Sequence, residues 1–157
     1  MANTTPFILT SRAALYPHDQ IVASYPVKVV SARYDGAALA AYKGSAVATS
    51  DVARLITIPA GALVLTVTHV VKTAEGGTCT YGIGDGDSTS GYVAAANGNS
   101  TSTNASSFNA DATTPDLGNG KYYAAADTID VILTSGTAAA VVIDISVVYI
   151  ETKPLAA

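Results

Sequence analysis

Charged residues are scarce in this chain of 157 residues: they make up 13% of it, about half the usual share. Eight Lys and Arg residues oppose twelve Asp and Glu residues, for a formal net charge of -4. The basic residues form no cluster, which excludes the positive footprint of a nucleic-acid-binding protein. A surface so poor in charge is one that partners could cover; the alternative is a β-protein whose uncharged face of small residues is itself soluble.

The residues that usually carry catalysis are also few. Cys79 is the single cysteine, which excludes a disulfide within the chain. It stands at an inward-facing strand position, so we expect a buried and unreactive thiol rather than a nucleophile. His69 lies on the apolar side of a long strand, which favours a core or interface residue over a general base. No Gly-x-Ser-x-Gly elbow, Walker loop or dinucleotide fingerprint occurs, and we expect neither an enzyme nor a cofactor.

Long apolar runs and leader features are missing as well. The opening residues MANTTPFILTSRAALYPHD contain no charged region followed by a long apolar run, so we expect no signal peptide. No apolar stretch reaches the ~20 residues that a membrane-spanning helix needs. We therefore expect no membrane partner, and a protein that is kept in a cytoplasm or assembled there into something larger.

The stretch from Arg54 to Asp87 organises the rest of the chain. It reads as a strand, a Pro-Gly turn, a long strand, a Gly-Gly turn and a further strand. The apolar residues of the long strand fall on alternate positions: Leu63, Leu65, Val67 and Val71. This two-residue period directs one face into a core. Glu75-Gly76-Gly77 is then expected to connect a β-hairpin, whose second strand contains Cys79, Tyr81 and Ile83.

Other strands are expected at residues 7–10, 21–32, 52–58, 93–96, 121–125, 128–133 and 141–150. Pro26 predicts an edge strand, a bulge or a break into two pieces within residues 21–32. We expect a loop with weak strand character at residues 33–50, because their glycines leave room for only about two helical turns. A turn is expected at Ser135-Gly136-Thr137. The strand at 141–150 is apolar on both faces, which predicts a central strand or one covered by another chain.

About eight short strands with turn signals predict an all-β fold, namely a single-domain β-sandwich that is jelly-roll-like. An immunoglobulin-like sandwich is the alternative, but the chain has no Trp and lacks the Cys…Trp…Cys pattern. We expect residues 1–20 to form an extended N-terminal arm, with a disordered tail as the alternative, and residues 21–157 to form the sandwich domain. That domain includes a long polar loop at 97–120, and loops of this length are usually functional or mobile.

Asp85-Gly86-Asp87-Ser88 has the spacing of a metal-binding loop, since alternate oxygen ligands in a Gly-containing loop suit Ca²⁺. An EF-hand would need Glu at the twelfth loop position, which is occupied by Ala96. We favour a solvated Gly-Asp turn and predict no metal site. Further Asp residues could supply a carboxylate pair for acid–base chemistry, although the sequence does not pair them: Asp111, Asp116, Asp127 and Asp130.

Nine tyrosines dominate the aromatic residues. Five of them fall on expected strands or near strand ends: Tyr81, Tyr92, Tyr122, Tyr123 and Tyr149. A tyrosine ring packs against apolar groups while its hydroxyl stays wet, which suits a protein interface. A carbohydrate-binding face and ordinary sandwich packing are the other two interpretations.

The run Ile58-Pro59-Ala60-Gly61-Ala62, the Val/Thr-rich strand after it, and residues 73–78 and 82–85 resemble a pattern in small virion proteins of tailed bacteriophages. The likeness covers about residues 50–90, and the C-terminal strand loosely. Some of those proteins are cement, or decoration, proteins of the outer capsid surface. The resemblance implies a jelly-roll-like module that forms a homotrimer where capsomers meet and has no catalytic residues.

On this resemblance we expect a bacteriophage capsid cement protein that binds and stabilises the assembled major capsid shell. It would be located on the capsid surface of the virion and assembled in the host cytoplasm. We expect the N-terminal arm and the second face of residues 141–150 to make the subunit and capsid contacts, and the loop at 97–120 to face solvent. The alternative is a tail-fibre or receptor-binding head domain, whose tyrosines and 97–120 loop would contact host-surface glycan.

Overall fold

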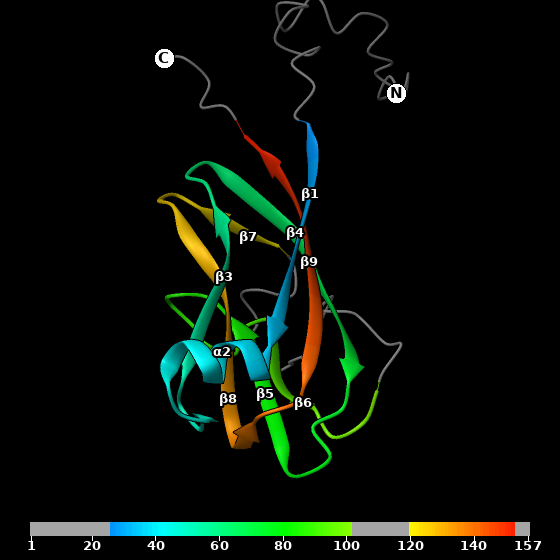
Figure 1. The fold of residues 1–157 in the computed structure, drawn as a ribbon. Helices are drawn as coiled ribbons and strands as arrows, with labels where there is room; N and C mark the ends of the chain where they lie inside the picture. The colour runs from blue at the N-terminus through cyan, green and yellow to red at the C-terminus, as the bar shows by residue number, and fades with distance from the viewer. Residues whose placement is uncertain (1–25, 102–119, 153–157) are drawn as a thin grey trace, which may run out of the picture.

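Two antiparallel β-sheets pack face to face in the structure, a computed structural model that describes residues 26–101 and 120–152 (Figure 1). The four-stranded sheet has the order β1 (Val27–Asp35), β9 (Val142–Glu151), β4 (Ala62–Thr73) and β7 (Lys121–Tyr123). The five-stranded sheet has the order β2 (Val47–Ala48), β8 (Asp127–Ala138), β5 (Cys79–Gly84) and β6 (Val93–Asn97), and β3 (Val52–Ile58) also pairs with β8.

The strand order is that of a jelly roll. β2 pairs with the last residues of β8 and β3 with its first half, so β2 and β3 together act as one interrupted strand. The first described strand then lies beside the last, and most successive strands alternate between the two sheets. The predicted all-β, jelly-roll-like sandwich is confirmed. The expected N-terminal arm at 1–20 and the strand at 7–10 lie outside the described residues, as does most of the 97–120 loop.

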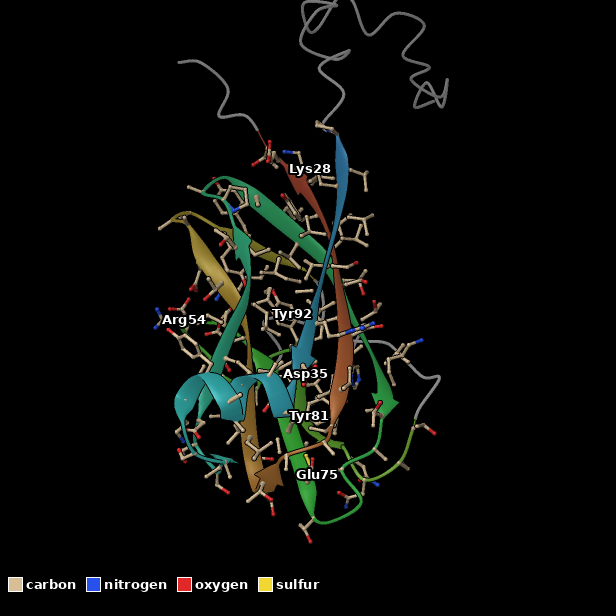
Figure 2. All side chains as sticks on the ribbon, viewed as in Figure 1. Lys28, Asp35, Arg54, Glu75, Tyr81 and Tyr92 are labelled. Atoms are coloured by element: carbon tan, nitrogen blue, oxygen red, sulfur yellow. The ribbon has the colours of Figure 1, made fainter. Side chains whose placement is uncertain are left out.

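The core lies between the sheets and is built by alternation along the longest strands. In β9 and the residue before it, the inward positions are fully or nearly fully buried: Val141, Ile143, Ile145, Val147 and Tyr149. In β8 the inward positions near its start are also buried: Ile129, Val131 and Leu133. The two-residue period predicted for both segments is confirmed. Tyr81 and Tyr92 lie among the side chains that fill the space between the sheets (Figure 2).

β4 departs from the strict alternation predicted for it. Val64 and Val67 are fully buried, whereas Leu63 and Leu65 are only half-buried. The pairing of β4 with β9 shifts register between Val64 and Thr66, so one extra residue stands in β4 at this bulge. The inward side chains therefore change from even to odd positions within the strand. The prediction was wrong for Leu63 and Leu65 and is confirmed for Val67 and Val71, both buried.

The predicted β-hairpin is not formed. β4 pairs with β7 and β9, and β5 pairs with β6 and β8, so Glu75-Gly76-Gly77 carries the chain from one sheet to the other. Gly76 does adopt a positive φ of 76°. Turn residues of this kind serve a hairpin and a crossover equally well, and for that reason the local sequence could not separate the two.

A short helix, α2 (Gly36–Lys43), lies where the sequence predicted a loop. Asp35 caps its start, since the side chain accepts a hydrogen bond of 3.0 Å from the Ala38 amide. Gly44 ends it in the left-handed conformation with a φ of 74°. Two caps compensate for the small number of turns, and the prediction of a loop with weak strand character was wrong for these residues. No helix in the described ranges is long and apolar enough to cross a membrane.

Two further boundaries differ from, or refine, the predictions. β1 begins at Val27, directly after Pro26, and is an edge strand of its sheet, as one of the alternatives predicted; residues 21–25 lie outside the described ranges, so a break at the proline stays a prediction. The predicted turn at Ser135-Gly136-Thr137 is wrong, because β8 continues to Ala138. Gly136 stays in the strand with a φ of 78°, next to a shift in the register between β8 and β5. The chain turns instead at residues 139–141.

Candidate functional site

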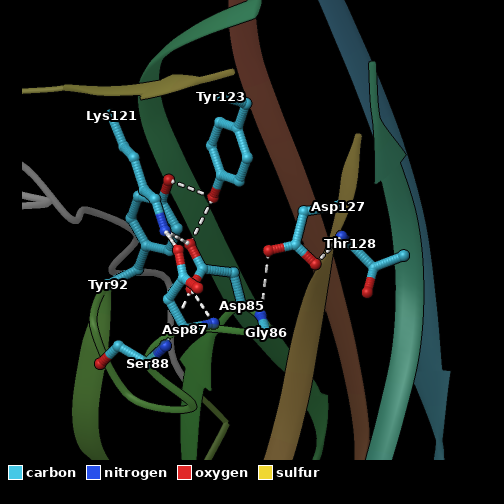
Figure 3. A network of polar contacts seen from close by, with 9 residues as sticks. All are labelled: Asp85, Gly86, Asp87, Ser88, Tyr92, Lys121, Tyr123, Asp127 and Thr128. Atoms are coloured by element: carbon cyan, nitrogen blue, oxygen red, sulfur yellow. Dashed lines mark hydrogen bonds and ion pairs between the residues drawn. The ribbon is translucent and has the colours of Figure 1, made fainter. Parts of the chain in front are cut away.

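The loop after β5 is fastened by a network of charged and hydroxyl groups (Figure 3). Asp85 has no exposed surface. Its Oδ1 accepts hydrogen bonds from the backbone amides of Asp87 at 3.1 Å and Ser88 at 2.9 Å. Its Oδ2 accepts one from the Lys121 ammonium at 2.7 Å and one from the Tyr123 hydroxyl at 2.6 Å. The prediction of a solvated turn was therefore wrong for Asp85.

The network keeps both charges of its central ion pair. Burial by itself would raise the pKa of Asp85, but hydrogen bonds from Lys121, Tyr123 and the Ser88 amide outweigh it, so the pKa lies below its usual value. Burial likewise opposes the charge of Lys121, but its two carboxylate partners raise its pKa. Burial, reinforced by Tyr92 and Asp85, raises the pKa of the Tyr123 hydroxyl, which therefore remains a donor.

Three carboxylates meet at this place. Asp85, Asp87 and Asp127 each bring an oxygen within 4.8 Å of the others. Lys121 supplies a cation from the chain itself, 2.7 Å from Asp85 and 2.8 Å from Asp87. Asp127 accepts hydrogen bonds from the amides of Gly86 at 3.2 Å and Thr128 at 2.8 Å. The Lys121 ammonium and the backbone amides can therefore balance the acidic groups without a metal ion. The absence of a metal site stays a prediction.

The segment after Asp85 folds back tightly on the end of β5. A Cβ atom on Gly84 would lie 1.9 Å from the Ser88 carbonyl oxygen, so only glycine allows this approach. The Tyr92 amide donates to the Ile83 carbonyl at 2.9 Å, and the Tyr92 and Tyr123 hydroxyls lie 2.9 Å apart. The loop and β7 are thus joined into one buried polar unit.

Sequence reasoning missed Lys121 and Tyr123 as partners of Asp85. They follow it by 36 and 38 residues, and no local motif links them. One signal was present: Lys121 and Tyr123 share a strand parity, opposite to that of Tyr122. This parity predicts that the two side chains lie on the same face of the strand, but it does not identify Asp85 as their partner.

Of the other two candidates for chemistry, His69 is half-buried and Cys79 lies in the core. His69 Nδ1 lies 2.7 Å from the Tyr81 hydroxyl, and the rings meet edge to face with centroids 5.6 Å apart. Burial lowers the pKa of His69, which favours the neutral imidazole. Cys79 is fully buried, as predicted, and burial raises the pKa of its thiol.

The outer face of the four-stranded sheet carries a row of apolar side chains. Strand register places Val27 opposite Ile150, Ile150 opposite Leu63, and Leu63 opposite Tyr122, so the row crosses all four strands. Residues of the opposite parity in these strands are buried between the sheets: Ala62, Val64, Tyr123 and Tyr149. The row therefore points away from the core. Val27 is 63% exposed and Tyr122 is 54% exposed.

The character of this outer face changes along the strands. Val29, which is 65% exposed, lies opposite Val148 and adds a second apolar pair. The next pair is polar, with the Ser31 and Ser146 hydroxyl oxygens 2.7 Å apart. Arg33 and Asp144 follow with hydrogen bonds of 2.6 and 3.1 Å. We name the apolar end the outer apolar patch; it consists of Val27, Val29, Leu63, Tyr122, Val148 and Ile150.

A second apolar surface lies beside α2. A groove of about 330 Å³ runs between this helix and β3. Its lining consists of Leu39, Tyr42, Lys43, Val47, Asp51, Val52, Ala53, Arg54 and Leu55. Lys43 and Asp51 form an ion pair there, and Tyr42 is 93% exposed. This groove belongs to the other sheet and is separate from the outer apolar patch.

No protein-family model and no curated protein matches this chain. Solved structures do. A chain in the acidic stable capsid structure of Helicobacter pylori bacteriophage KHP30 is 12% identical, covers 79% of this chain and 86% of its own length, and has a TM-score of 0.50. A chain in the cyanophage Pam1 capsid asymmetric unit is 21% identical, covers 79% and 84%, and has a TM-score of 0.54. At these identities the likeness shows that the fold is shared.

Proposed function

We propose that the chain is a structural protein of a bacteriophage capsid, and specifically a cement, or decoration, protein that binds the assembled major capsid shell. The observation that carries this proposal is the fold shared with chains of two phage capsid structures. The resemblance of about residues 50–90 to virion proteins of tailed phages supports it. The protein would be located on the capsid surface of the virion after assembly in the host cytoplasm.

A cement protein needs affinity for the shell and not for its separated parts. Anything that binds only the assembled state stabilises it by mass action, by about 2.7 kcal/mol per site when its concentration is 100 times the dissociation constant. An uncharged, flat contact surface suits this task, because protein interfaces are depleted of charge at their centre. The composition of the chain suits such a contact, since only 13% of its residues are charged.

The proposed role is non-enzymatic, with a homotrimer as the working unit. The side chains best suited to catalysis are engaged in structure. Cys79 is buried, His69 is hydrogen-bonded to the Tyr81 hydroxyl, and the carboxylate of Asp85 is paired with Lys121. These contacts support a structural role over a catalytic one.

A tail-fibre or receptor-binding head domain that recognises host-surface glycan is the alternative. It would rely on tyrosines and on the loop at 97–120. Four of the five tyrosines considered for that face are buried: Tyr81, Tyr92, Tyr123 and Tyr149. Tyr122 is the one of these five that is exposed, and the burial of the other four favours the capsid role over glycan recognition.

Particles produced with and without the gene for this chain test the proposal. Electron microscopy should show additional trimeric density on the outer surface of particles that contain the protein, at the meeting points of capsomers. Shells that lack it should release their genome at a lower temperature, and purified protein added back should restore the difference. Shells that already carry a full complement should bind no more and serve as the control.

Two results would count against the capsid role. The purified chain should bind assembled shells and not the unassembled major capsid protein, so equal binding to both would remove the stabilising mechanism. Selective binding on a glycan array, together with no binding to shells, would favour the receptor-binding alternative.

A further inference from the structure

We propose that the outer apolar patch is a docking surface for residues 7–9 of the N-terminal arm of a neighbouring copy of this chain. The inference rests on the self-association contained in the proposed function, and it identifies the surface and the segment that produce it. It does not depend on what else the protein binds.

The patch requires an apolar, uncharged partner. Its outermost row contains one Val, Ile, Leu or Tyr side chain from each of β1, β9, β4 and β7, and its second row contains Val29 and Val148 and ends at the uncharged Thr66 of β4. Val27, Val29 and Tyr122 are 63%, 65% and 54% exposed, and the charged pair Lys28–Glu151 lies beside the patch rather than within it. On the same face the polar rows that begin at Ser31 and Ser146 limit its extent.

The shape of the patch favours an extended segment over a second sheet. Four neighbouring strands span roughly 14 Å at about 4.8 Å per spacing, and two outward rows span about 7 Å along a strand. A strip of this shape accommodates about five extended residues that cross the strands at about 3.3 Å each. A whole sheet would need apolar side chains over a larger area, including positions where Arg33 and Asp144 form their ion pair.

The chain itself contains such a segment. Residues 1–25 precede the described structure, and Phe7-Ile8-Leu9 is the bulkiest uncharged run among them, bounded by Pro6 and Thr10. The residues between Leu9 and Pro26 can extend over roughly 50 Å. That reach exceeds the diameter of a domain of this size, which is about 40 Å. Residues 7–9 can therefore reach a neighbouring subunit.

The direction of β1 favours a neighbour's arm over the chain's own arm. Val27 begins β1 in the outermost row, and Val29 of the second row lies further into the sheet. β1 begins and β9 ends at the same end of the sheet, near Lys28 (Figures 1 and 2). For its own arm to cross the patch, the chain would have to turn back over the end from which β1 begins. A neighbour's arm can cross the strands without that reversal.

Cysteine pairs test the contact directly. In a Cys79→Ala background, Leu9→Cys combined with Val29→Cys should give disulfide-linked oligomers on a non-reducing gel, and a reductant should return them to monomers. Leu9→Cys with Thr57→Cys is the matched control, because Thr57 is exposed on β3 of the other sheet. A cross-link within one chain, or equal cross-linking in both pairs, would overturn the proposal. If Cys79→Ala does not fold, the native background serves, because the Cys79 thiol is buried.

Charge substitutions measure the contribution to association. Val29→Lys and Leu9→Lys should each raise the apparent dissociation constant of the oligomer about ten-fold or more in light scattering or sedimentation, since each removes one buried apolar side chain. Val52→Lys is the control, because Val52 is 45% exposed on the other sheet. All three variants should keep the circular dichroism spectrum of the parent. An unchanged constant in Val29→Lys would contradict the assignment.

The same variants separate this proposal from the capsid role. Cross-linked oligomers that do not bind shells would leave the docking contact standing and remove the capsid function. Shell binding by a protein in which cysteines at positions 9 and 29 never cross-link would support the capsid function and remove the docking contact. The two ideas can therefore fail independently.

Discussion

The Nζ atom of Lys121 lies 2.7 Å from Oδ2 of Asp85, and the two residues belong to different sheets. Lys121 is the first residue of β7 in the four-stranded sheet, and Asp85 directly follows β5 in the five-stranded sheet. The Lys121 side chain is 17% exposed and that of Asp85 is fully buried. The contact therefore acts as a polar clamp between the layers of an otherwise apolar sandwich.

Removal of one partner of this clamp should be costly. Lys121→Met leaves the Asp85 carboxylate buried without its cation, and we expect the free energy of unfolding at pH 7 to fall by about 3 kcal/mol. The pKa of Asp85 is lowered in the folded state. The difference in free energy of unfolding between the wild type and Lys121→Met should therefore be complete above the ordinary pKa near 3.9 and be lost as the pH falls through the folded pKa. Urea unfolding at several pH values measures both effects.

A surface ion pair provides the control for the clamp. Lys43→Met breaks the pair with Asp51, whose side chain is 35% exposed, and we expect a much smaller change because solvent screens such charges. An equal decrease in the free energy of unfolding in Lys121→Met and Lys43→Met would show that the buried ion pair stabilises the fold no more than the exposed one.

Asp130 should respond to pH in the opposite direction. It is 3% exposed, and its Oδ1 has no hydrogen-bond partner among the described residues. Burial, assisted by the charges of Asp127 and Asp85, raises its pKa. Its contribution to stability therefore declines as the pH rises from about 3.9 through the folded value. Asp130→Asn should raise the free energy of unfolding at pH 7 by on the order of 1 kcal/mol, and the gain should vanish below about pH 4.

Asp144→Asn is the matched comparison for Asp130→Asn. The hydrogen bond from Arg33 lowers the pKa of Asp144, so this substitution should decrease stability at pH 7, with the loss disappearing on acidification. Thermal unfolding at several pH values measures the change in stability of each variant. If this change depended on pH in the same direction for both, it would contradict opposite pKa shifts for Asp130 and Asp144.

Periodicity predicted the strands whose inward parity is unbroken. The alternation in residues 128–133 and 141–150 gave the correct core positions, since both segments run straight through the sheet contacts that bury them. In β4 the extra residue at the bulge, Leu65, reversed the parity. The local sequence contains no mark of this bulge, because Val, Leu and Thr suit both faces of a strand.

The connections and the polar network were harder to predict for a different physical reason. Which strand pairs with which, and which Lys meets Asp85, depends on contacts between distant segments. Helix α2, in contrast, could have been found, because Asp35 and Gly44 stand at its two ends as an N-cap and a C-terminal glycine. The prediction considered the shortness of the segment between its glycines and not the caps at its ends.

Glu75 should control the stability of the turn between β8 and β9. Its carboxylate accepts hydrogen bonds from the amides of Ala139 at 2.9 Å, Ala140 at 2.8 Å and Val141 at 2.8 Å. Glu75→Ala should lower the free energy of unfolding by about 2 kcal/mol and Glu75→Gln by about half as much, since charge-assisted hydrogen bonds are stronger than neutral ones. Amide hydrogen exchange at Ala140 and Val141 should accelerate.

The pH dependence of the Glu75 contribution follows from the same contacts. Burial opposes the charge, but the three amides outweigh it and lower the pKa of Glu75. The stabilisation is therefore present above the ordinary pKa near 4.3 and is lost as the pH falls through the folded value. Glu151→Ala, which removes the exposed partner of Lys28, should leave exchange at the turn unchanged; acceleration in this control would mean that the effect is not local.

Substitution of Gly136 tests whether β8 is continuous where the sequence predicted a turn at Ser135-Gly136-Thr137, and substitution of Gly77 is the control. Gly136 has a φ of 78°, and a Cβ atom there would lie 1.8 Å from the Thr78 carbonyl oxygen on the neighbouring strand. Gly136→Ala should therefore lower the free energy of unfolding by more than about 2 kcal/mol. Gly77→Ala meets nothing within 4 Å and should change stability by less than about 0.5 kcal/mol. If urea unfolding showed Gly136→Ala to be as stable as Gly77→Ala, β8 would not pass this close to Thr78.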